Sequence, residues 1–279
     1  MAEFLSLPQA VSRFVTPGAS VALEGFTHLI PFAAGHEIIR QRLTDLTLIR
    51  MTPDLLYDQM IGCGCARRLV FSWGGNPGVG SLHRLRDAVE NDWPGPLEIE
   101  EHSHAAMAHA YAAGAAGMPC AIFRGYLGSD LVRVNPRIRT IDCPFSGERL
   151  AAVPALRPDV AIVHAQKADW RGNVLLSGIV GVQKEAALAA RRAIVTVEEI
   201  VDDLQSAGSN AVVLPSWTVD AVVEAPRGAR PSYAHGYYQR DNAFYTQWDA
   251  IARNRDRFRR WIDAEVMSAE RPQSGGHRA

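Results

Sequence analysis

The stretch His164-Ala165-Gln166-Lys167-Ala168-Asp169-Trp170-Arg171-Gly172-Asn173 follows directly after the apolar run Val160-Ala161-Ile162-Val163. The apolar run predicts a buried strand, and the polar residues after it predict a turn where the strand ends. Ligands of α/β proteins bind outside the carboxyl ends of parallel strands, so this order of residues predicts an α/β fold. Within the turn we expect a structural role, with an ion pair between Lys167 and Asp169 and a left-handed backbone at Gly172.

Short apolar runs alternate with helical patterns along the rest of the chain. Continuous apolar strands separated by helices imply a parallel sheet covered on both faces. We therefore predict an α/β fold with a mostly parallel sheet flanked by helices. The predicted strands are Val21–Leu23, Leu46–Arg50, Leu69–Phe71, Leu97–Ile99, Ala121–Phe123, Val160–Val163, Ala193–Val197 and Val219–Val223. The predicted helices are Gly35–Arg42, Asp54–Met60, Leu82–Glu90, Ala105–Ala113, Gln183–Ala190 and Phe244–Met267, with Asp54, Ser81 and Ser103 as N-caps.

The size of the chain suits one large core. It has 279 residues, of which 47% are hydrophobic, and no interdomain linker is evident. We predict a single domain over residues 1–270 and a disordered tail over residues 271–279, which contain Pro, Gln, Ser and two glycines. The Pro-rich residues 135–158 are expected to form an excursion from the main sheet.

Charge and hydropathy argue against two classes of partner. The formal net charge is -1, and the arginine clusters are short and flanked by apolar residues, whereas nucleic-acid-binding proteins usually carry a basic stripe. The N-terminus lacks a basic segment followed by a long apolar one, and no apolar run approaches the ~20 residues of a membrane span. We expect a cytoplasmic enzyme that binds neither nucleic acid nor membrane.

The four cysteines, Cys63, Cys65, Cys120 and Cys143, are predicted to be reduced core residues. Cys63-Gly64-Cys65 resembles a redox or metal-binding fragment, but no second pair lies at ligand spacing. We therefore predict no metal site. No Gly-x-Ser-x-Gly elbow and no activated thiol points to a nucleophile within the chain.

The first candidate loop is Glu24-Gly25-Phe26-Thr27-His28, directly after the first predicted strand. Gly25 lets the backbone approach a ligand closely. Phe26 is placed to cover an acyl chain, and Thr27 and His28 to donate hydrogen bonds to a thioester or carboxylate. A tight turn with a capping threonine is the alternative, and the residues alone leave both open.

The second candidate loop, Ser72–Ser81, is rich in glycine and precedes a predicted helix. Its backbone N–H groups around Gly74, Gly75 and Asn76 are candidates for binding an anion. A flexible turn without a ligand is the alternative. The loop lacks both the Gly-Lys-Ser/Thr of a phosphate-binding loop and the glycine spacing of the dinucleotide fingerprint, so we expect no nicotinamide cofactor.

Two further candidates lie later in the chain. Glu101 stands in Glu100-Glu101-His102, where a carboxylate beside imidazoles suits general acid/base work, although adjacent strand residues face opposite ways. A capping or structural role is the alternative for the histidines. Tyr126 and Gly128 follow another predicted strand, and Tyr126 is either a wall of an acyl pocket or a buried turn tyrosine.

Several motifs together resemble one family. The turn after the apolar strand reads His-Ala-x-Lys-Ala-Asp-x-x-Gly-Asn, and the chain order is similar to a strand with a Gly-aromatic loop, a glutamate before a helix, and a late Glu-x-Pro-x-Gly-Ala-x-Pro segment. These motifs resemble the alpha subunits of family I coenzyme A transferases of the glutaconate/3-oxoacid type. They lie at Val21–His28, Leu97–Glu101, Ala113–Pro119, His164–Asn173, Thr196–Val201 and Val219–Ser232.

The resemblance implies a CoA-transferase-like fold and a CoA transfer between an acyl-CoA and a carboxylic acid. In the family the glutamate nucleophile belongs to a beta subunit, so a hetero-oligomer with a shared active site is implied. Coenzyme A is then a substrate, with no tightly bound cofactor. Glu101 aligns with the family's glutamate before the helix and is the predicted catalytic residue. The alternatives are a subunit of a CoA-thioester ring-opening hydrolase of steroid degradation and a non-catalytic acyl-CoA-binding subunit.

Overall fold

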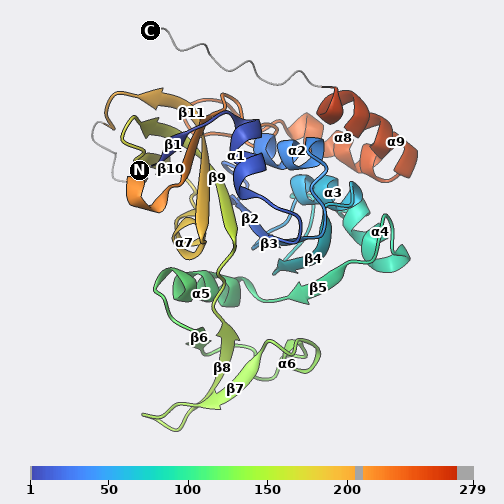
Figure 1. Cartoon of the computed structure of the whole chain (residues 1–279). Coiled ribbons are helices and arrows are strands. Elements are labelled where there is room, and N and C mark those ends of the chain that lie inside the picture. Colours follow the sequence, from blue (N-terminus) through green and yellow to red (C-terminus); the bar gives the residue numbers. More distant parts are fainter. Residues whose placement is uncertain (1, 205–209, 269–279) are drawn as a thin grey trace.

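A ten-stranded sheet forms the centre of the molecule in this computed structural model, which describes residues 2–204 and 210–268 (Figure 1). Along the order β1-β13-β11-β9-β2-β3-β4-β5 every neighbouring pair is parallel, while β10 and β12 extend the sheet antiparallel beyond β9. The predicted mostly parallel sheet is confirmed. Its strands are β1 Glu3–Phe4, β2 Ser20–Glu24, β3 Leu46–Arg50, β4 Ala66–Phe71, β5 Glu98–Glu101, β9 Val160–Asp169, β10 Val174–Ser177, β11 Arg192–Val201, β12 Ala211–Leu214 and β13 Ala221–Glu224.

Helices cover both faces of the sheet, because its strands are apolar on both sides. Val21 and Leu23 pack with α1–α4 and the C-terminal helices, whereas Ala22 between them packs with α5 and α7 on the opposite face. No helix in the described ranges is long and apolar enough to cross a membrane. The helices are α1 Leu7–Phe14, α2 Phe32–Arg40, α3 Leu55–Gly62, α4 His83–Asn91, α5 His104–Ala115, α6 Leu131–Val134, α7 Gln183–Ala189, α8 Asn242–Ala252 and α9 Arg255–Trp261, with the short η1 Ser216–Thr218 and the π-helical η2 Ile262–Met267.

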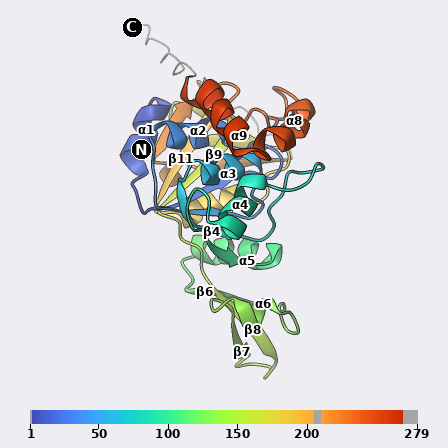
Figure 2. The same ribbon diagram turned by 90° about the vertical axis from the view of Figure 1, so that its right-hand side faces the viewer.

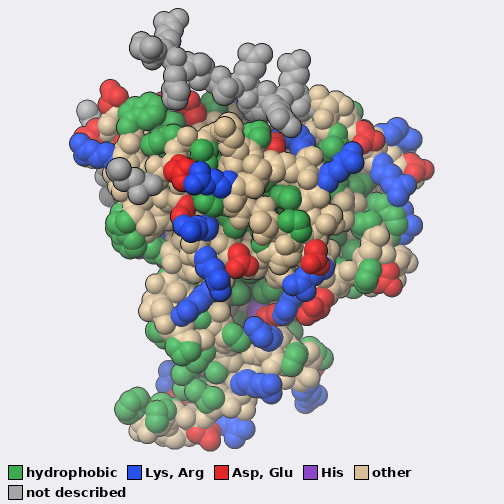
Figure 3. Space-filling model, viewed as in Figure 1, with side chains coloured by type: hydrophobic (Ala, Val, Ile, Leu, Met, Phe, Trp, Pro, Cys, Tyr) green, Lys and Arg blue, Asp and Glu red, His purple; other side chains and the backbone are tan. Residues whose placement is uncertain are grey.

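A small antiparallel sheet projects away from the main body in both ribbon views (Figure 1, Figure 2). Its strands β6 (Cys120–Phe123), β8 (Arg149–Pro154) and β7 (Arg139–Asp142) pair in that order, and α6 lies beside them. Hydrophobic side chains gather near its tip, and charges of both signs mix around the waist above it (Figure 3). The excursion predicted for residues 135–158 is confirmed, and it begins earlier, at β6.

Three local predictions were wrong. Strand β9 does not end before His164 but runs on to Asp169, because β11 pairs with it on one side and β10 on the other. Helix α4 is capped by Leu82 rather than Ser81. The C-terminal helix predicted over Phe244–Met267 is divided into α8, α9 and η2.

Other predictions of the chain's organisation were confirmed or stay open. Asp54 and Ser103 do cap their helices through side-chain oxygens, as predicted. The disordered tail predicted for residues 271–279 lies outside the described residues, and the single domain over residues 1–270 stays a prediction.

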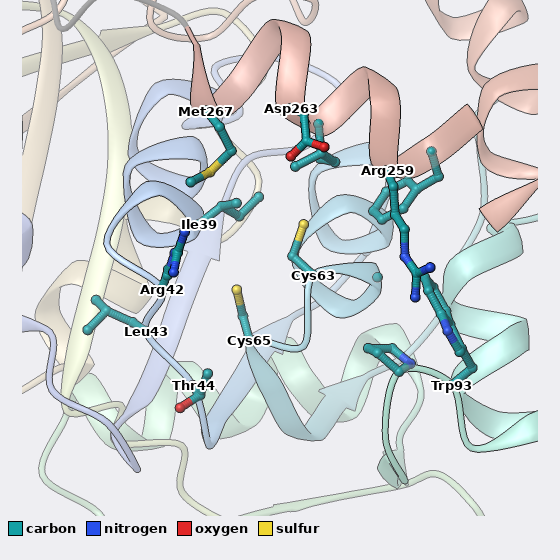
Figure 4. A pocket seen from close by; sticks show the side chains of 14 residues that line it. Ile39, Arg42, Leu43, Thr44, Cys63, Cys65, Trp93, Arg259, Asp263 and Met267 are labelled. Atoms are coloured by element: carbon teal, nitrogen blue, oxygen red, sulfur yellow. The ribbon is translucent and has the colours of Figure 1, made fainter. Parts of the chain in front are cut away.

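A cavity of about 460 Å³ opens beside the amino ends of β3 and β4, between α2, α3 and η2 (Figure 4). Cys63 and Cys65 line it together with Ile39 and Met267, while Arg42 is exposed at its rim. Burial raises the pKa of the Cys65 thiol to about 12 and also raises that of Cys63. Both thiols therefore stay protonated and unreactive near neutral pH.

Cys143, in the loop between β7 and β8, has the opposite setting. A hydrogen bond from the Ser146 side chain lowers the pKa of its thiol, and backbone hydrogen bonds from Phe145 and Ser146 add to this effect. In the native protein treated with the disulfide reagent DTNB at pH 8, we expect a fast phase that disappears in Cys143→Ser and persists in Cys65→Ser. Loss of the fast phase in Cys65→Ser instead would contradict this assignment.

Candidate functional site

A buried ion pair lies where β2 and β3 end. Arg50 is the last residue of β3; its Nη1 donates to Asp54 Oδ1 at 2.8 Å, and its Nη2 donates to the carbonyl oxygen of Gly25 at 2.9 Å. Glu24, the last residue of β2, accepts from the backbone N–H of Met51 at 3.0 Å and from the hydroxyl of Tyr111 at 2.8 Å. Burial raises the pKa of Glu24, although Arg50 and these donors oppose the effect. The network fixes the backbone that leads into the Gly25–His28 loop.

The loop itself combines close packing with a strained backbone. A Cβ atom at Gly25 would lie 2.9 Å from the carbonyl oxygens of His28 and Leu29, so only glycine fits there. Thr27 has a φ of 56°, which is rare for a β-branched residue and common at functional sites. Phe26 and Thr27 are partly exposed, and their backbone N–H groups make no hydrogen bond to another described residue. Two free donors therefore lie at the carboxyl end of a central strand.

His28 is fully buried beneath this loop, and both of its ring nitrogens are occupied. Nδ1 lies 2.9 Å from the carbonyl oxygen of Ile179, so it must carry the proton, while Nε2 accepts from the backbone N–H of His235 at 2.9 Å. Burial lowers the pKa of His28, which agrees with a neutral ring. His28 holds the loop in this structure; the substrate contact predicted for it would require one of these bonds to break.

The glycine-rich loop after β4 lies beside this site. The hydroxyl of Ser72 donates to the carbonyl of Met51 at 2.6 Å, which places the loop next to the residue that binds Glu24. The N–H groups of Gly75 and Asn76 donate to Pro53 and Gly80, and the Asn76 side chain donates to Tyr245 in α8 at 2.7 Å. These two N–H groups already bind carbonyl oxygens of the chain itself. Anion binding by this loop therefore stays a prediction.

Glu101 lies apart from the Gly25–His28 loop but beside the start of the Ser72–Ser81 loop, since its register partner in β4 is Phe71. It ends β5 at the edge of the sheet, three strands from β2, or about 14 Å at roughly 4.8 Å per strand. Its side chain is exposed and lines a cavity of about 390 Å³ with Asn135 and Arg137, whereas Glu100 is buried against Arg68 and His102. A catalytic role for Glu101 stays a prediction.

Tyr126 lies on another face of α5 than Phe26, and Gly128 follows it two residues later in the chain. The Tyr126 hydroxyl accepts from the backbone N–H of Ser103 at 2.7 Å, and its ring packs with Ala106 and Ala110 of α5. Phe26 packs instead with the Met107 side of the helix. The structure therefore brings together the Gly25–His28 and Ser72–Ser81 loops but not these two residues.

The His164–Asn173 stretch has the structural role that we expected, but some of its side chains make other contacts than the predicted ones. Lys167 pairs with Glu199 at 2.7 Å, so the predicted ion pair with Asp169 is wrong. Asp169 accepts instead from the backbone N–H groups of Arg171 and Asn173, and Gly172 has a φ of 86°. These contacts shape the β9–β10 hairpin.

Sequence reasoning missed the network around Arg50 and a second one around Glu198. Glu198, in β11, accepts from His164 Nε2 at 2.7 Å and from the Tyr238 hydroxyl at 2.5 Å. Both residues are charged and stand at or near the carboxyl ends of apolar strands. That position was the available signal, because a buried charge there must bind a loop, a ligand or another charge.

Comparison with known proteins decides the family. A model of the coenzyme A transferase family matches residues 4–225. One of the subunits of the 3-oxoadipate CoA-transferase of Pseudomonas knackmussii is 68% identical over 270 residues, which cover 97% of this chain and 95% of that protein. The chain belongs to the coenzyme A transferase family.

Two further comparisons agree with that assignment of a CoA-transferase chain. The corresponding chain of the glutaconate CoA-transferase of Acidaminococcus fermentans is 34% identical over 92% of this chain and 86% of its own length. The crystal structure of the glutaconate CoA-transferase of the same organism superimposes with a TM-score of 0.89 at 32% identity, over 96% of this chain and 90% of that one. The predicted resemblance and fold are confirmed. Both sequence relatives are named as individual subunits of their enzymes, which implies a partner chain.

The Arg50–Asp54 pair gives a direct test of the site's architecture. Asp54→Ala leaves the buried guanidinium without its carboxylate and removes the α3 cap, so we expect a loss of about 3–5 kcal/mol in the free energy of unfolding, measured by urea denaturation. Glu90→Ala is the matched control, since it removes an exposed pair with Arg86 on α4 and should cost about 0–1 kcal/mol. Equal losses in the two variants would show that the buried pair does not hold the site.

Proposed function

We propose that this alpha subunit of a CoA-transferase moves coenzyme A between an acyl-CoA and a carboxylic acid of the 3-oxoadipate type, in an active site shared with a beta subunit. The observation that carries the proposal is the Gly25–His28 loop, which presents two free N–H groups beside Phe26. The choice of acid rests on the 68% identity to a chain of the 3-oxoadipate enzyme. Coenzyme A is then a substrate, and the proposal includes no tightly bound cofactor.

The loop suits the stabilisation of a thioester oxygen. During acyl transfer, negative charge develops on the carbonyl oxygen, and fixed backbone N–H groups stabilise it without reorganisation. Phe26 packs with Met51, Met107 and Val182, which gives an apolar wall beside the free N–H groups. The left-handed φ of Thr27 is a strained conformation of the kind found at ligand sites, which supports a functional role for this loop.

The nucleophile is proposed to be a glutamate of the beta subunit. A carboxylate attacks the thioester carbon, the C–S bond breaks, and an anhydride and the CoA thiolate form. The thiolate then attacks the glutamyl carbon of the anhydride, which releases the first acid and leaves a glutamyl-CoA thioester. An acceptor carboxylate reverses both steps with a new acyl group.

The carboxylates that this chain places near the loop are already engaged. Glu24 is buried and bound to Met51 and Tyr111, and Glu198 is buried and bound to His164 and Tyr238. Glu101 is exposed but lies about 14 Å away across the sheet at the strand spacing given above. A nucleophile from the partner chain therefore fits the geometry better than any of these three.

The first test is CoA exchange. We expect no transfer from succinyl-CoA to 3-oxoadipate by the purified chain alone, and transfer when its beta-type partner is added. A CoA adduct should be detectable by mass spectrometry on a glutamate of the added chain. Turnover by the chain alone would contradict the shared site, and thioester binding without turnover in either state would favour the acyl-CoA-binding alternative.

The second test separates transferase from ring-opening hydrolase through Glu101. In a transferase, Glu101 would orient the substrate or a helper group rather than react, so Glu101→Gln should lower turnover while the glutamyl-CoA adduct on the beta subunit persists. In a hydrolase that uses Glu101 as its acid/base group, the same change should remove roughly 10²–10⁴-fold in rate, with no adduct on either chain. Glu98→Gln, an exposed carboxylate on the same strand, is the control. Full activity of Glu101→Gln would exclude a role for this residue in either reaction.

A further inference from the structure

The second buried network joins two neighbouring strands of the sheet. His164 of β9 has no exposed surface, and its Nε2 lies 2.7 Å from Glu198 Oε1 of β11. Its Nδ1 lies 2.8 Å from the hydroxyl of Thr196. Since a carboxylate oxygen only accepts, Nε2 must carry a proton. Burial opposes ionisation of Glu198, but hydrogen bonds from His164 and Tyr238 outweigh it and lower the pKa of the carboxyl.

Glu198 also binds both ends of the segment that follows β13, residues 225–238. Its Oε2 accepts from the backbone N–H of Arg227 at 2.7 Å, and its Oε1 accepts from the Tyr238 hydroxyl at 2.5 Å. Gly228 packs directly on the imidazole, because a Cβ atom there would lie 2.9 Å from His164 Cε1. One carboxylate therefore fixes the segment at two points that lie near its opposite ends.

Residues 225–238 also bind the strained Gly25–His28 loop through hydrogen bonds. The Ser232 hydroxyl donates to the carbonyl oxygen of Thr27 at 2.9 Å, and the backbone N–H of His235 donates to His28 Nε2 at 2.9 Å. The N–H of Leu29, whose φ is 51°, donates to the carbonyl of Tyr233 at 2.9 Å. Left-handed backbone at threonine and leucine persists only where surrounding contacts impose it.

We propose that the His164–Glu198 pair is a second positioning element of the active site, beside the Arg50 network, and that it acts on the Gly25–His28 loop through residues 225–238. His164 does not touch substrate, since it is fully buried, and Glu198 has its oxygens engaged by the chain itself. Their effect is to fix where the free N–H groups of Phe26 and Thr27 lie. The effect on turnover rests on the proposed function; the effect on the loop does not.

The test compares Glu198→Gln with Glu199→Gln in the complex with the beta subunit. The second variant is a matched control, because Glu199 is the next residue in β11 and its pairs with Lys167 and Tyr237 lie at the surface. Glutamine at position 198 keeps the size of the side chain but places an NH₂ group against one of its donors. We expect kcat to fall roughly 10- to 100-fold through loop misplacement, with KM changed less than about threefold because ground-state binding is retained.

The second readout is amide hydrogen exchange within residues 25–31, above all of Leu29, whose N–H binds the carbonyl oxygen of Tyr233 in residues 225–238. We expect exchange there to be at least about tenfold faster in Glu198→Gln than in the wild type, since the loop loses its support. The Glu199→Gln variant should exchange like the wild type. Tyr238→Phe, which removes a single hydroxyl, gives the same comparison if Glu198→Gln does not fold.

Two results would overturn the proposal. One is that Glu198→Gln and Glu199→Gln match each other in both kcat and loop exchange. The other is a fall in kcat with unchanged exchange in residues 25–31, since Glu198 would then act by another route. If the wild-type complex shows no CoA transfer, the proposed function fails, and the exchange data alone decide whether the pair positions the loop.

Discussion

The site depends on the hydrogen bonds that the buried guanidinium of Arg50 makes. A buried cation is tolerated only when its hydrogen bonds are satisfied by opposite charge and by carbonyl groups. Arg50 meets this condition at its two terminal nitrogens, which bind Asp54 at the start of α3 and the carbonyl oxygen of Gly25 at the end of β2, whereas its buried Nε has no partner among the described residues. Because the Arg50 side chain binds both Asp54 and Gly25, the end of β2, the start of α3 and the Gly25–His28 loop cannot move independently. The glutamate–tyrosine contact between Glu24 and Tyr111 adds α5 to the same unit.

The network around Glu198 supports the later residues of the Gly25–His28 loop, whereas Arg50 supports its first residue. Glu198 binds the segment of residues 225–238, and this segment binds Thr27 and His28 through hydrogen bonds. Motifs that lie far apart in the sequence thus meet in one place, where the carboxyl end of β2 lies beside His164 in the middle of β9 and Glu198 in the later part of β11. Such a loop is over-determined, which is the condition under which left-handed threonine survives. A rigid set of N–H donors is also what stabilisation of a developing oxyanion requires.

The fold could be predicted from the sequence because its signals are local. Alternating apolar strands and helical patterns determine a covered parallel sheet, and Asp54 and Ser103 indicate helix starts. The extension of β9 through His164 was not predictable in this way, because polar residues stay in a strand only when both neighbours pair with them. The site was predicted in part: the Gly25–His28 loop follows from a strand end and a glycine. Arg50 and Glu198 were missed because their partners come from distant segments, and only the fold brings these together.

We expect the reacting thioester to lie at the Gly25–His28 loop and not at the edge of the sheet beside Glu101. The direct measurement is a crystal structure of the complex with the beta subunit, its nucleophilic glutamate replaced, and an acyl-CoA bound. We expect the thioester oxygen to lie about 3 Å from the backbone nitrogens of Phe26 and Thr27. A thioester seated against Glu101, with these two N–H groups unoccupied, would contradict it.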